Sequence, residues 1–362
     1  MKKKLRCGVI GATGMVGLKF LELLSEHPWI EVVVVAASER SAGQSMKLKV
    51  PIEIQTRIDR SILELVIQNA SDVKTIAPQV DFIFCAIDLP KDKIIELEES
   101  YAKHEVVVVS NNSAMRWHDD VPMIVPEING VKHLKILEIQ KQRLATTKGC
   151  IVVKPNCAAQ AYMALLDALV DTILIEDVSV SLMQAISGSG KHLYDVPEIH
   201  DNILPLIGEA KKSILEPLKI FGKIIKGKIV FDNLPISATS YRVGVEDGHL
   251  ANIFIRVEPR QKNITERIKI LFESYKPLQI YCLPSSPKVV INYLGDDVYP
   301  IPKEHANNQG GMEFTCGALE YNKKSGIIRV TGLIHNLIRG AAGGAVLTAE
   351  LMIKLGYITS KF

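Results

Sequence analysis

Residues 8–17 have the sequence GVIGATGMVG, and this stretch decides the fold. An apolar, strand-like segment (KLRCGVI, 4–10) leads into Gly11, Gly14 and Gly17, and a segment with apolar residues at helical spacing follows (MVGLKFLELLSEH, 15–27). Glycines between a strand and a helix permit a tight turn and let a pyrophosphate approach the helix N-terminus. The spacing G-x-x-G-x-x-G differs from the usual G-x-G-x-x-G, and a plain tight turn is the alternative. The position after an N-terminal strand favours a dinucleotide site.

The segments that follow alternate between strand and helix patterns. IEVVVVAA (30–37), VDFIFCAI (80–87) and HEVVVVS (104–110) are apolar, β-branched runs, as expected of parallel strands covered on both faces. This alternation predicts an α/β fold with a Rossmann-like, doubly wound parallel sheet over residues 1–155.

The pattern changes near residue 155. DVSVSLMQAIS (177–187), NLPISATSYRVGV (233–245) and HLANIFIRVE (249–258) are long strand-like segments without a helix between each pair. We therefore expect an α+β catalytic and dimerisation domain over 156–335, with a mostly antiparallel sheet. The glycine-containing helical segment at 336–362 is expected to pack back on the first domain.

Composition excludes several classes of protein. The chain has 362 residues, of which 47% are hydrophobic and 23% charged, with a formal net charge of +3. No basic stripe indicates nucleic-acid binding, and no apolar run is long enough to span a membrane. The six cysteines form no C-x-x-C pair and no zinc-type spacing with histidine. We expect a cytoplasmic protein without a metal, a nucleic-acid partner or a membrane partner.

The end of the second strand indicates which dinucleotide binds. A carboxylate there usually holds the ribose 2′-hydroxyl of NAD. The chain has AASERSAG at 36–43, where Ser38, Arg40 and Ser41 offer a guanidinium and two hydroxyls that suit a 2′-phosphate. Glu39 could serve NAD, and a solvated loop is the third reading. We predict NADP as the cofactor.

Cys157 lies where a reactive thiol would be expected. In CIVVKPNCAAQ (150–160) an apolar run ends in Pro155-Asn156, Cys157 follows, and a helical pattern comes next. A helix N-terminus favours thiolate, and Asn156 could donate to an oxyanion formed by thiolate attack. The alternative is a buried thiol that only fills the core.

A base for this thiol is offered by YRVGVEDGH (241–249). If Asp247-Gly248 forms a two-residue hairpin turn, Glu246 pairs with His249, and Arg242 then shares a sheet face with His249. An imidazole and a guanidinium on one face could act as acid/base and anion clamp. An ordinary surface histidine is the alternative.

Two further segments contribute candidates. MQAISGSGK (183–191) ends a strand in a glycine-serine loop that could lie against a nicotinamide. In ILPLIGEAKKSI (203–214), Glu209 and Lys212 are three residues apart on a predicted helix and share one face. By themselves they would be a solvated ion pair.

Taken together in order, these motifs identify a family. Over nearly its whole length the chain resembles the archaeal and fungal branch of aspartate-β-semialdehyde dehydrogenase. The resemblance rests on the segments GATGMVG, SERSAG, SNNSAMRWHDDVPMIVPEIN, PNCAAQ, MQAISGSG, GEAKKS, RVGVEDGH and HNLIRGAAGGA.

The resemblance implies a reaction, the reductive dephosphorylation of L-aspartyl-4-phosphate by NADPH through a cysteine acyl-thioester. It implies the following roles: Cys157 as nucleophile, His249 as general acid/base, Asn156 and Gln184 as orienting groups, Arg242 on the substrate carboxylate, Glu209 on its amino group, and Lys212 and Arg116 on the acyl phosphate. The expected cofactor contacts are Gly11, Thr13, Gly14, Met15, Val16, Ser38, Arg40, Ser41, Ser187, Gly188 and, at the nicotinamide end, Asn336.

Two alternatives stay open at this stage. Archaeal malonyl-CoA reductases share the implied fold, and CAAQ and HNLIRGAAGG fit them as well, whereas Asn156 and the Glu209/Lys212 pair favour the semialdehyde enzyme. A catalytically inactive protein that senses NADPH would need no reactive cysteine. The resemblance also implies a homodimer or homotetramer that acts on a small molecule.

Overall fold

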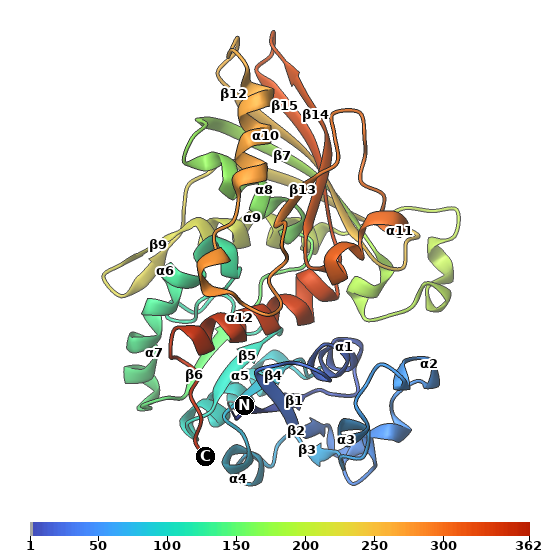
Figure 1. Ribbon diagram of the computed structural model, residues 1–362, viewed down its shortest axis with the longest axis vertical. Helices are drawn as coiled ribbons and strands as arrows, with labels where there is room; N and C mark the ends of the chain where they lie inside the picture. The colour runs from blue at the N-terminus through green and yellow to red at the C-terminus, as the bar shows by residue number, and fades with distance from the viewer. Residues whose placement is uncertain (1–2) are drawn as a thin grey trace.

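The computed structural model describes residues 3–362 and contains two large β-sheets and a small two-stranded one. The two large sheets lie at opposite ends of the molecule, with helix α12 (Gly343–Lys354) between them (Figure 1). Within the described residues no helix is both long and apolar enough to cross a membrane. The same part of the chain holds no group of three or more His, Cys, Asp or Glu side chains suited to a metal ion.

The glycine motif joins the first strand to the first helix. Strand β1 (Leu5–Ile10) ends just before Gly11, and α1 (Met15–Leu24) begins just after Gly14. Gly11 has φ +88°, and a Cβ on it would lie 2.5 Å from the carbonyl oxygen of Ala86. A Cβ on Gly17 would lie 2.1 Å from the carbonyl oxygen of Gly11. Only glycine therefore permits this turn and the close approach of α1.

The first sheet has six parallel strands in the order β3-β2-β1-β4-β5-β6, which confirms the predicted doubly wound fold. Its strands are β1, β2 (Ile30–Ala37), β3 (Gln68–Asn69), β4 (Phe82–Cys85), β5 (Val107–Ser110) and β6 (Cys150–Val153). The strand order reverses between β1 and β4. Because ligands bind beyond the carboxyl ends of the strands at such a reversal, Gly11 and the segment after β4 border the expected cofactor crevice.

Helices and short helical turns cover both faces of this sheet. The helices of this half of the chain, besides α1, are α2 (Ile52–Gln55), α3 (Arg60–Leu63), α4 (Val73–Ile76), α5 (Lys91–Lys103), α6 (Val131–His133) and α7 (Leu137–Leu144). The buried strand residues Val9, Phe84 and Val109 form part of one apolar core, with Phe20 of α1 stacked on Phe84.

The second large sheet has seven strands in the order β13-β14-β15-β12-β7-β11-β8, and four of its six pairings are antiparallel. Its strands are β7 (Ile175–Gln184), β8 (Leu204–Pro205), β11 (Ile236–Arg242), β12 (His249–Val257), β13 (Ile291–Tyr293), β14 (Phe314–Asn322) and β15 (Ile327–Ile334). The separate two-stranded sheet pairs β9 (Lys223–Ile225) with β10 (Lys228–Val230). The prediction of an α/β protein with a second, mostly antiparallel part is thus confirmed.

One face of the second sheet is covered and the other is open. The remaining helices are α8 (Gln160–Val170), α9 (Ile207–Phe221), α10 (Ile264–Ser274) and α11 (Pro302–His305). Buried residues of β7 and β12, such as Val180 and Ile253, share a core with Leu165 of α8 and Ile268 of α10. Phe254 of β12, which is 38% exposed, belongs to the opposite face.

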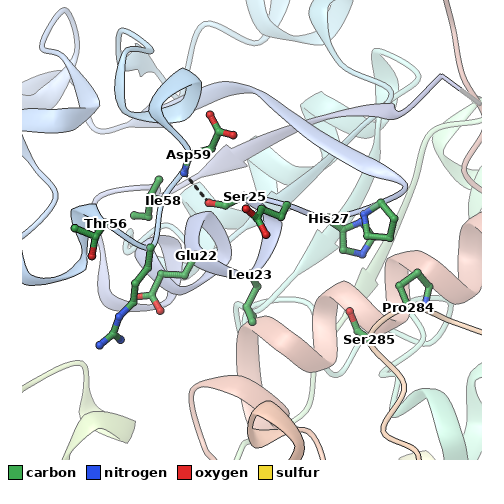
Figure 2. Close-up of a pocket in the computed structure, with 12 residues that line it drawn as sticks. Glu22, Leu23, Ser25, His27, Thr56, Ile58, Asp59, Pro284 and Ser285 are labelled. Atoms are coloured by element: carbon green, nitrogen blue, oxygen red, sulfur yellow. Dashed lines mark hydrogen bonds between the residues drawn. The ribbon is translucent and has the colours of Figure 1, made fainter. Parts of the chain in front are cut away.

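The C-terminal helix α12 joins the two parts of the molecule. It contacts α1 and β5, and its fully buried Glu350 pairs with Nε2 of His27 at 2.8 Å. Figure 2 shows His27 beside Pro284 and Ser285, where the end of α1 meets a segment from the second half of the chain. The backbone N–H of Ser285 also donates to Glu350, at 3.0 Å.

The predicted hairpin at Asp247-Gly248 is wrong. Strands β11 and β12 are not neighbours, because β7 lies between them, parallel to β11 and antiparallel to β12. Gly248, with φ +104°, belongs to a longer loop that crosses over the end of β7. Its backbone bonds go to the segment after β7: the N–H groups of Ile186 and Ser187 donate to Val245 and Glu246. An Asp-Gly pair marks a turn but does not specify which strand pairs with which.

Candidate active site

A cavity of about 530 Å³ runs from the N-terminus of α1 to Cys157. Segments from both halves of the chain line it. The predicted site residues among its lining are Met15, Val16, Arg116, Asn156, Cys157, Ser187, Gly188, Glu209, Lys212 and Asn336. The tertiary structure therefore brings together residues that are more than 300 positions apart in the sequence.

Cys157 and His249 form a pair beside this cavity. The sulfur of Cys157 lies 3.2 Å from Nε2 of His249, and Nδ1 of His249 accepts the N–H of Ala185 at 3.0 Å. Because a backbone N–H can only donate, Nδ1 carries no proton, and the neutral imidazole carries its proton on Nε2, directed at the sulfur. Burial, with Arg242 and His335 nearby, lowers the pKa of His249 to about 3. His249 is therefore a neutral hydrogen-bond donor.

The thiol itself is protonated at neutral pH. Burial and the Glu209 carboxylate raise the pKa of Cys157 to about 11, although Arg116 and Arg242 act to lower it. The low pKa expected from a helix N-terminus is not found, because the effect of burial outweighs the groups that lower the pKa. Cys157 also lies before the first residue of α8, Gln160. The dipole effect falls off within the first turn of a helix.

This predicts how alkylation of Cys157 depends on pH. Below the thiol pKa the thiolate fraction rises tenfold per pH unit, and thiolate is the reactive species. In the ligand-free protein, the rate at which iodoacetamide modifies Cys157 should therefore rise by about tenfold per unit between pH 7 and pH 10. Peptide-resolved mass spectrometry separates Cys157 from the exposed Cys282. A rate that is already at its plateau near pH 7 would contradict the assignment.

The Arg242 side chain lies near His249, although the two strands do not form the predicted hairpin. Its Nη1 donates to the carbonyl of Ala185 at 2.7 Å. A Cβ on Gly188 would lie 2.9 Å from Nε2 of His249 and 3.1 Å from Nη1 of Arg242. Both side chains thus converge on Gly188, although the strand β7 separates their own strands. Gly188 leaves the space in which a substrate can contact both.

Glu209 and Lys212 of α9 form another part of the cavity lining. Lys212 Nζ donates to Glu209 at 2.5 Å, and the amide N–H of Asn156 donates to the other oxygen of Glu209. Although burial acts to raise it, bonding to Lys212 and Asn156 lowers the pKa of Glu209. Glu209 is therefore an ionised carboxylate next to the nucleophile. The Asn156 amide is directed at this carboxylate and not at the sulfur.

Gln184 and Asn336 act as braces in this structure. The Gln184 amide donates to Ser240 Oγ at 2.7 Å, and Gln184 does not line the cavity. Asn336 donates to Ser187 Oγ and accepts the N–H of Gly248, each at 2.8 Å. Asn336 thereby fixes the loops that carry Ser187 and Gly248.

The far end of the cavity fits a dinucleotide. The first-turn N–H groups of α1 have no partner within the helix, and no side chain caps them. Met15 and Val16 in that turn line the cavity, and Gly11, Thr13 and Gly14 form the turn before it. Asn111 lines the same cavity, and both atoms of its side-chain amide are buried without a protein partner. These orphaned polar groups fit a bound phosphate and carboxamide.

The loop expected to hold the 2′-phosphate lies beyond the cavity lining. Ser38, Glu39 and Arg40 are exposed at the carboxyl end of β2, and Ser41 is buried. The short 3₁₀ turn Glu39–Ser41 thus presents Arg40 to solvent.

Several polar residues at the site were not predicted from the sequence. They are Asn111, Lys154, Glu216 and Lys219. Asn111 follows an apolar parallel strand at its carboxyl end, which is itself a signal for a ligand contact. Glu216 and Lys219 continue the helix face that carries Glu209 and Lys212. Lys154 could not be found from its spacing, because it is buried by the tertiary structure alone.

Another cavity, of about 520 Å³, lies at the end of α1 and contains none of the predicted residues. Figure 2 shows its lining, where the backbone N–H of Asp59 donates to Ser25 Oγ. No catalytic pair like Cys157 and His249 lines this cavity.

The chain is similar to known proteins in both sequence and structure. Residues 6–136 match the family described as "Semialdehyde dehydrogenase, NAD binding domain", and residues 166–339 match "Semialdehyde dehydrogenase, dimerisation domain". An aspartate-semialdehyde dehydrogenase from Archaeoglobus fulgidus is 38% identical over 96% of this chain and 97% of its own length. A malonyl CoA reductase (NADP) from Metallosphaera sedula is 30% identical over 100% of both chains.

A solved structure gives the same picture. The crystal structure of an aspartate semialdehyde dehydrogenase with NADP from Candida albicans superimposes with a TM-score of 0.86 at 29% identity. The match covers 98% of this chain and 100% of that one.

Proposed function

Because the chain belongs to the aspartate-semialdehyde dehydrogenase family, we propose that it converts L-aspartyl-4-phosphate and NADPH to L-aspartate-4-semialdehyde, phosphate and NADP. This is a step of amino-acid biosynthesis from aspartate. One observation carries the proposal: the Cys157–His249 pair, 3.2 Å apart, borders the cavity that Arg116, Glu209 and Lys212 also line. A nucleophile, an anion site and a cation site thus meet at one place.

In the first half of the reaction, Cys157 forms the acyl-thioester. Its sulfur bonds to the acyl carbon, the bond from that carbon to the phosphate oxygen breaks, and the thiol proton departs on the phosphate as HPO₄²⁻. The Nε2–H of His249 and the guanidinium groups of Arg116 and Arg242 stabilise the sulfur as it loses its proton. Arg116 and Lys212 hold the leaving phosphate.

In the second half, the thioester is reduced. NADPH, when bound, supplies the hydride. His249 Nε2–H donates to the oxygen on which negative charge develops, and Glu209 holds the substrate ammonium. Asn336 and Ser187 keep the loops around Gly188 in place. The C–S bond of the resulting tetrahedral alkoxide then breaks, which releases the aldehyde and the Cys157 thiolate, and the thiolate takes up a proton from solvent to return to its thiol form.

The malonyl-CoA reductase reaction is the second candidate, because one relative carries that name. Malonyl-CoA has no amino group to pair with Glu209, and its phosphates lie far from the reacting carbon. The Glu209–Lys212 pair beside Asn156 therefore favours the aspartyl substrate. The test compares NADP reduction by aspartate semialdehyde and phosphate with NADPH oxidation by malonyl-CoA. Faster turnover of malonyl-CoA would overturn the substrate assignment.

Variants of the α9 pair give a second test of the substrate. Lys212→Ala should raise the KM for phosphate more than it lowers kcat, and Glu209→Ala should impair the reaction of aspartate semialdehyde. Steady-state kinetics in the direction of NADP reduction measures both. Lys211→Ala, on the exposed side of the same helix, is the matched control. If the pair is only a solvated i,i+3 ion pair, both variants keep full activity and lose about 0.2–0.5 kcal/mol of helix stability.

The choice of NADP depends on Arg40. Arg40→Ala should weaken the binding of NADPH by about tenfold to a hundredfold and leave NADH nearly unaffected, because a charge-assisted hydrogen bond contributes roughly 1.5–3 kcal/mol. Cofactor fluorescence titration measures both affinities. Equal losses for the two cofactors would exclude Arg40 as a ligand of the 2′-phosphate and would point to Glu39.

The protein is further proposed to form a homodimer through the open face of its second sheet. Residues 166–339 match a dimerisation domain, and Ser237, Thr239 and Phe254 are exposed on β11 and β12. Sedimentation equilibrium should give twice the chain mass of 40.0 kDa. A mass four times that of the chain would instead indicate a tetramer.

A further inference from the structure

Helix α9 carries two further charged residues, Glu216 and Lys219, on the face from which Glu209 and Lys212 line the cavity. Glu209, Lys212, Glu216 and Lys219 are spaced by three, four and three positions, so they lie along one face of the helix. Glu209 and Lys212 are partly exposed, whereas Glu216 and Lys219 are each only 1% exposed. Burying a charge is costly unless it is paired and hydrogen-bonded. The partners of the buried pair therefore show what the pair does.

Glu216 bonds both to Arg116, which is proposed to hold the phosphate, and to the segment that carries Cys157. One carboxylate oxygen accepts Nη1–H of Arg116 at 2.9 Å, and the other accepts the backbone N–H of Asn156, directly before Cys157. Arg116 also donates its Nε–H to the carbonyl of Lys154 at 2.9 Å. Two contacts thus fix the plane of the guanidinium, which lines the cavity.

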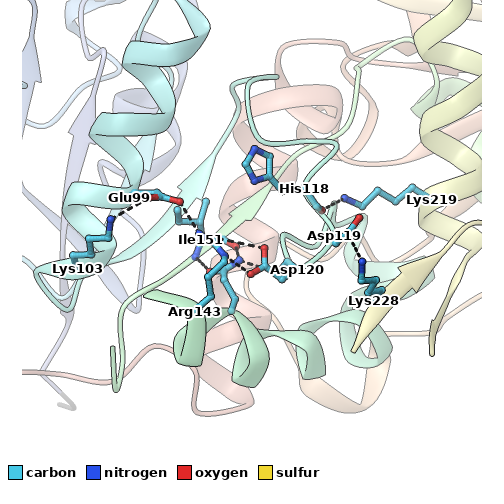
Figure 3. Close-up of polar contacts among 10 residues, drawn as sticks. Glu99, Lys103, His118, Asp119, Asp120, Arg143, Ile151, Lys219 and Lys228 are labelled. Carbon is cyan, nitrogen blue, oxygen red and sulfur yellow. Dashed lines mark hydrogen bonds and ion pairs between the residues drawn. The ribbon is translucent and has the colours of Figure 1, made fainter. Parts of the chain in front are cut away.

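Lys219 holds the loop from which Arg116 projects. Its ammonium donates to the carbonyls of Arg116, His118 and Val121, at 2.6, 2.7 and 3.0 Å. An ammonium has three N–H donors, and all three are used on this one loop. Figure 3 shows Lys219 directed at the loop near His118.

Ion pairs of Asp119 and Asp120 also hold this loop on its outer side. Lys228 pairs with Asp119 at 2.8 Å, and Arg143 pairs with Asp120 at 2.5 Å. Both pairs are visible in Figure 3. The loop is therefore held from two sides, and Lys219 and Glu216 hold it from the side of α9.

We propose that Glu216 is a positioning residue that sets the distance between the Arg116 guanidinium and the Cys157 nucleophile. A carboxylate can accept from Arg116 and from the Asn156 N–H at the same time. An amide of the same shape can accept at one oxygen only and presents an N–H to the other donor. The proposal rests on the proposed function in that the anion held by Arg116 is the phosphate of the substrate or the inorganic phosphate released from it.

The test uses inorganic phosphate as a probe and requires no turnover. Phosphate bound at Arg116 and Lys212 should protect Cys157 from iodoacetamide in the intact protein. The measured quantity is the phosphate concentration that halves the alkylation rate. Glu216→Gln should raise this concentration by about tenfold to a hundredfold, the size expected from loss of a charge-assisted hydrogen bond. In turnover, the KM for phosphate should rise by a similar factor and kcat should change far less.

Two further variants make the result decisive. Glu216→Asp keeps the charge and is too short to reach both donors, so it should also raise the half-protecting phosphate concentration. Lys211→Gln, on the exposed side of α9, should leave it unchanged. If either position-216 variant fails to fold, the other one decides. If Glu216 has only a structural role, its variants should lose thermal stability but keep the wild-type phosphate concentration that halves the alkylation rate. That result in the folded variants would overturn the proposal.

The outcome separates this proposal from the proposed function. If the protein turns over aspartate semialdehyde while the position-216 variants keep the wild-type phosphate protection, the function stands and the positioning role is wrong. If protection depends on Glu216 but aspartate semialdehyde is not a substrate, the positioning role stands and the reaction is another one.

Discussion

Replacing Cys157 with serine should lower turnover of aspartate semialdehyde by on the order of 10⁴–10⁶-fold, the range seen when a covalent nucleophile and its partners are removed. A serine hydroxyl needs an adjacent base to attack at neutral pH. In this structure His249 is not arranged as that base, because its Nδ1 accepts the N–H of Ala185, which leaves the proton on Nε2, and burial lowers its pKa to about 3. The hydroxyl would therefore stay protonated.

The Cys157→Ser variant should still bind NADPH, because the cofactor end of the cavity is built from α1 and its preceding turn. Progress curves of NADP reduction and cofactor fluorescence measure the two properties separately. Cys282→Ser, which changes the exposed cysteine, is the control and should keep full turnover. Substantial turnover by Cys157→Ser would rule out the acyl-thioester route.

Removing the donor of His249 should have the second largest effect. His249→Asn places an amide oxygen where Nδ1 accepts the Ala185 N–H and leaves nothing at the Nε2 position. We expect kcat to fall by about 10²–10³-fold, as for loss of one hydrogen-bond donor to a developing oxyanion, with a far smaller change in KM. Steady-state kinetics with aspartate semialdehyde measures both constants.

His249→Gln is the matched variant, because its amide N–H reaches the Nε2 position without an ionisable group. If His249 is a neutral donor, His249→Gln should keep clearly more activity than His249→Asn. If His249 must take up and release a proton, the two variants should be equally poor. An unchanged kcat in both variants would show that His249 takes no part in the reaction.

Much of the fold could be predicted from the sequence, because its local signals agree with each other. Gly11 and Gly17 are required by backbone contacts that no side chain tolerates, and the β-branched runs match strands buried on both faces. The order of the strands in the second sheet could not be predicted from such local signals. Asp247-Gly248 indicated a turn, and the insertion of β7 between β11 and β12 depends on pairing over long sequence distances.

By itself, the sequence determined the chemical groups of the site: a cysteine after Pro155-Asn156, a histidine after a glycine turn, and a Glu-Lys pair on one helix face. Only the tertiary structure decided their protonation and their partners. Cys157 has a raised pKa and His249 a lowered one because burial removes water from both. Likewise, Glu216 holds Arg116 because α9 packs on a loop 100 residues away in the chain. Local sequence patterns specify which groups are present, whereas desolvation and long-range contacts, which exist only in the folded chain, set what those groups can do.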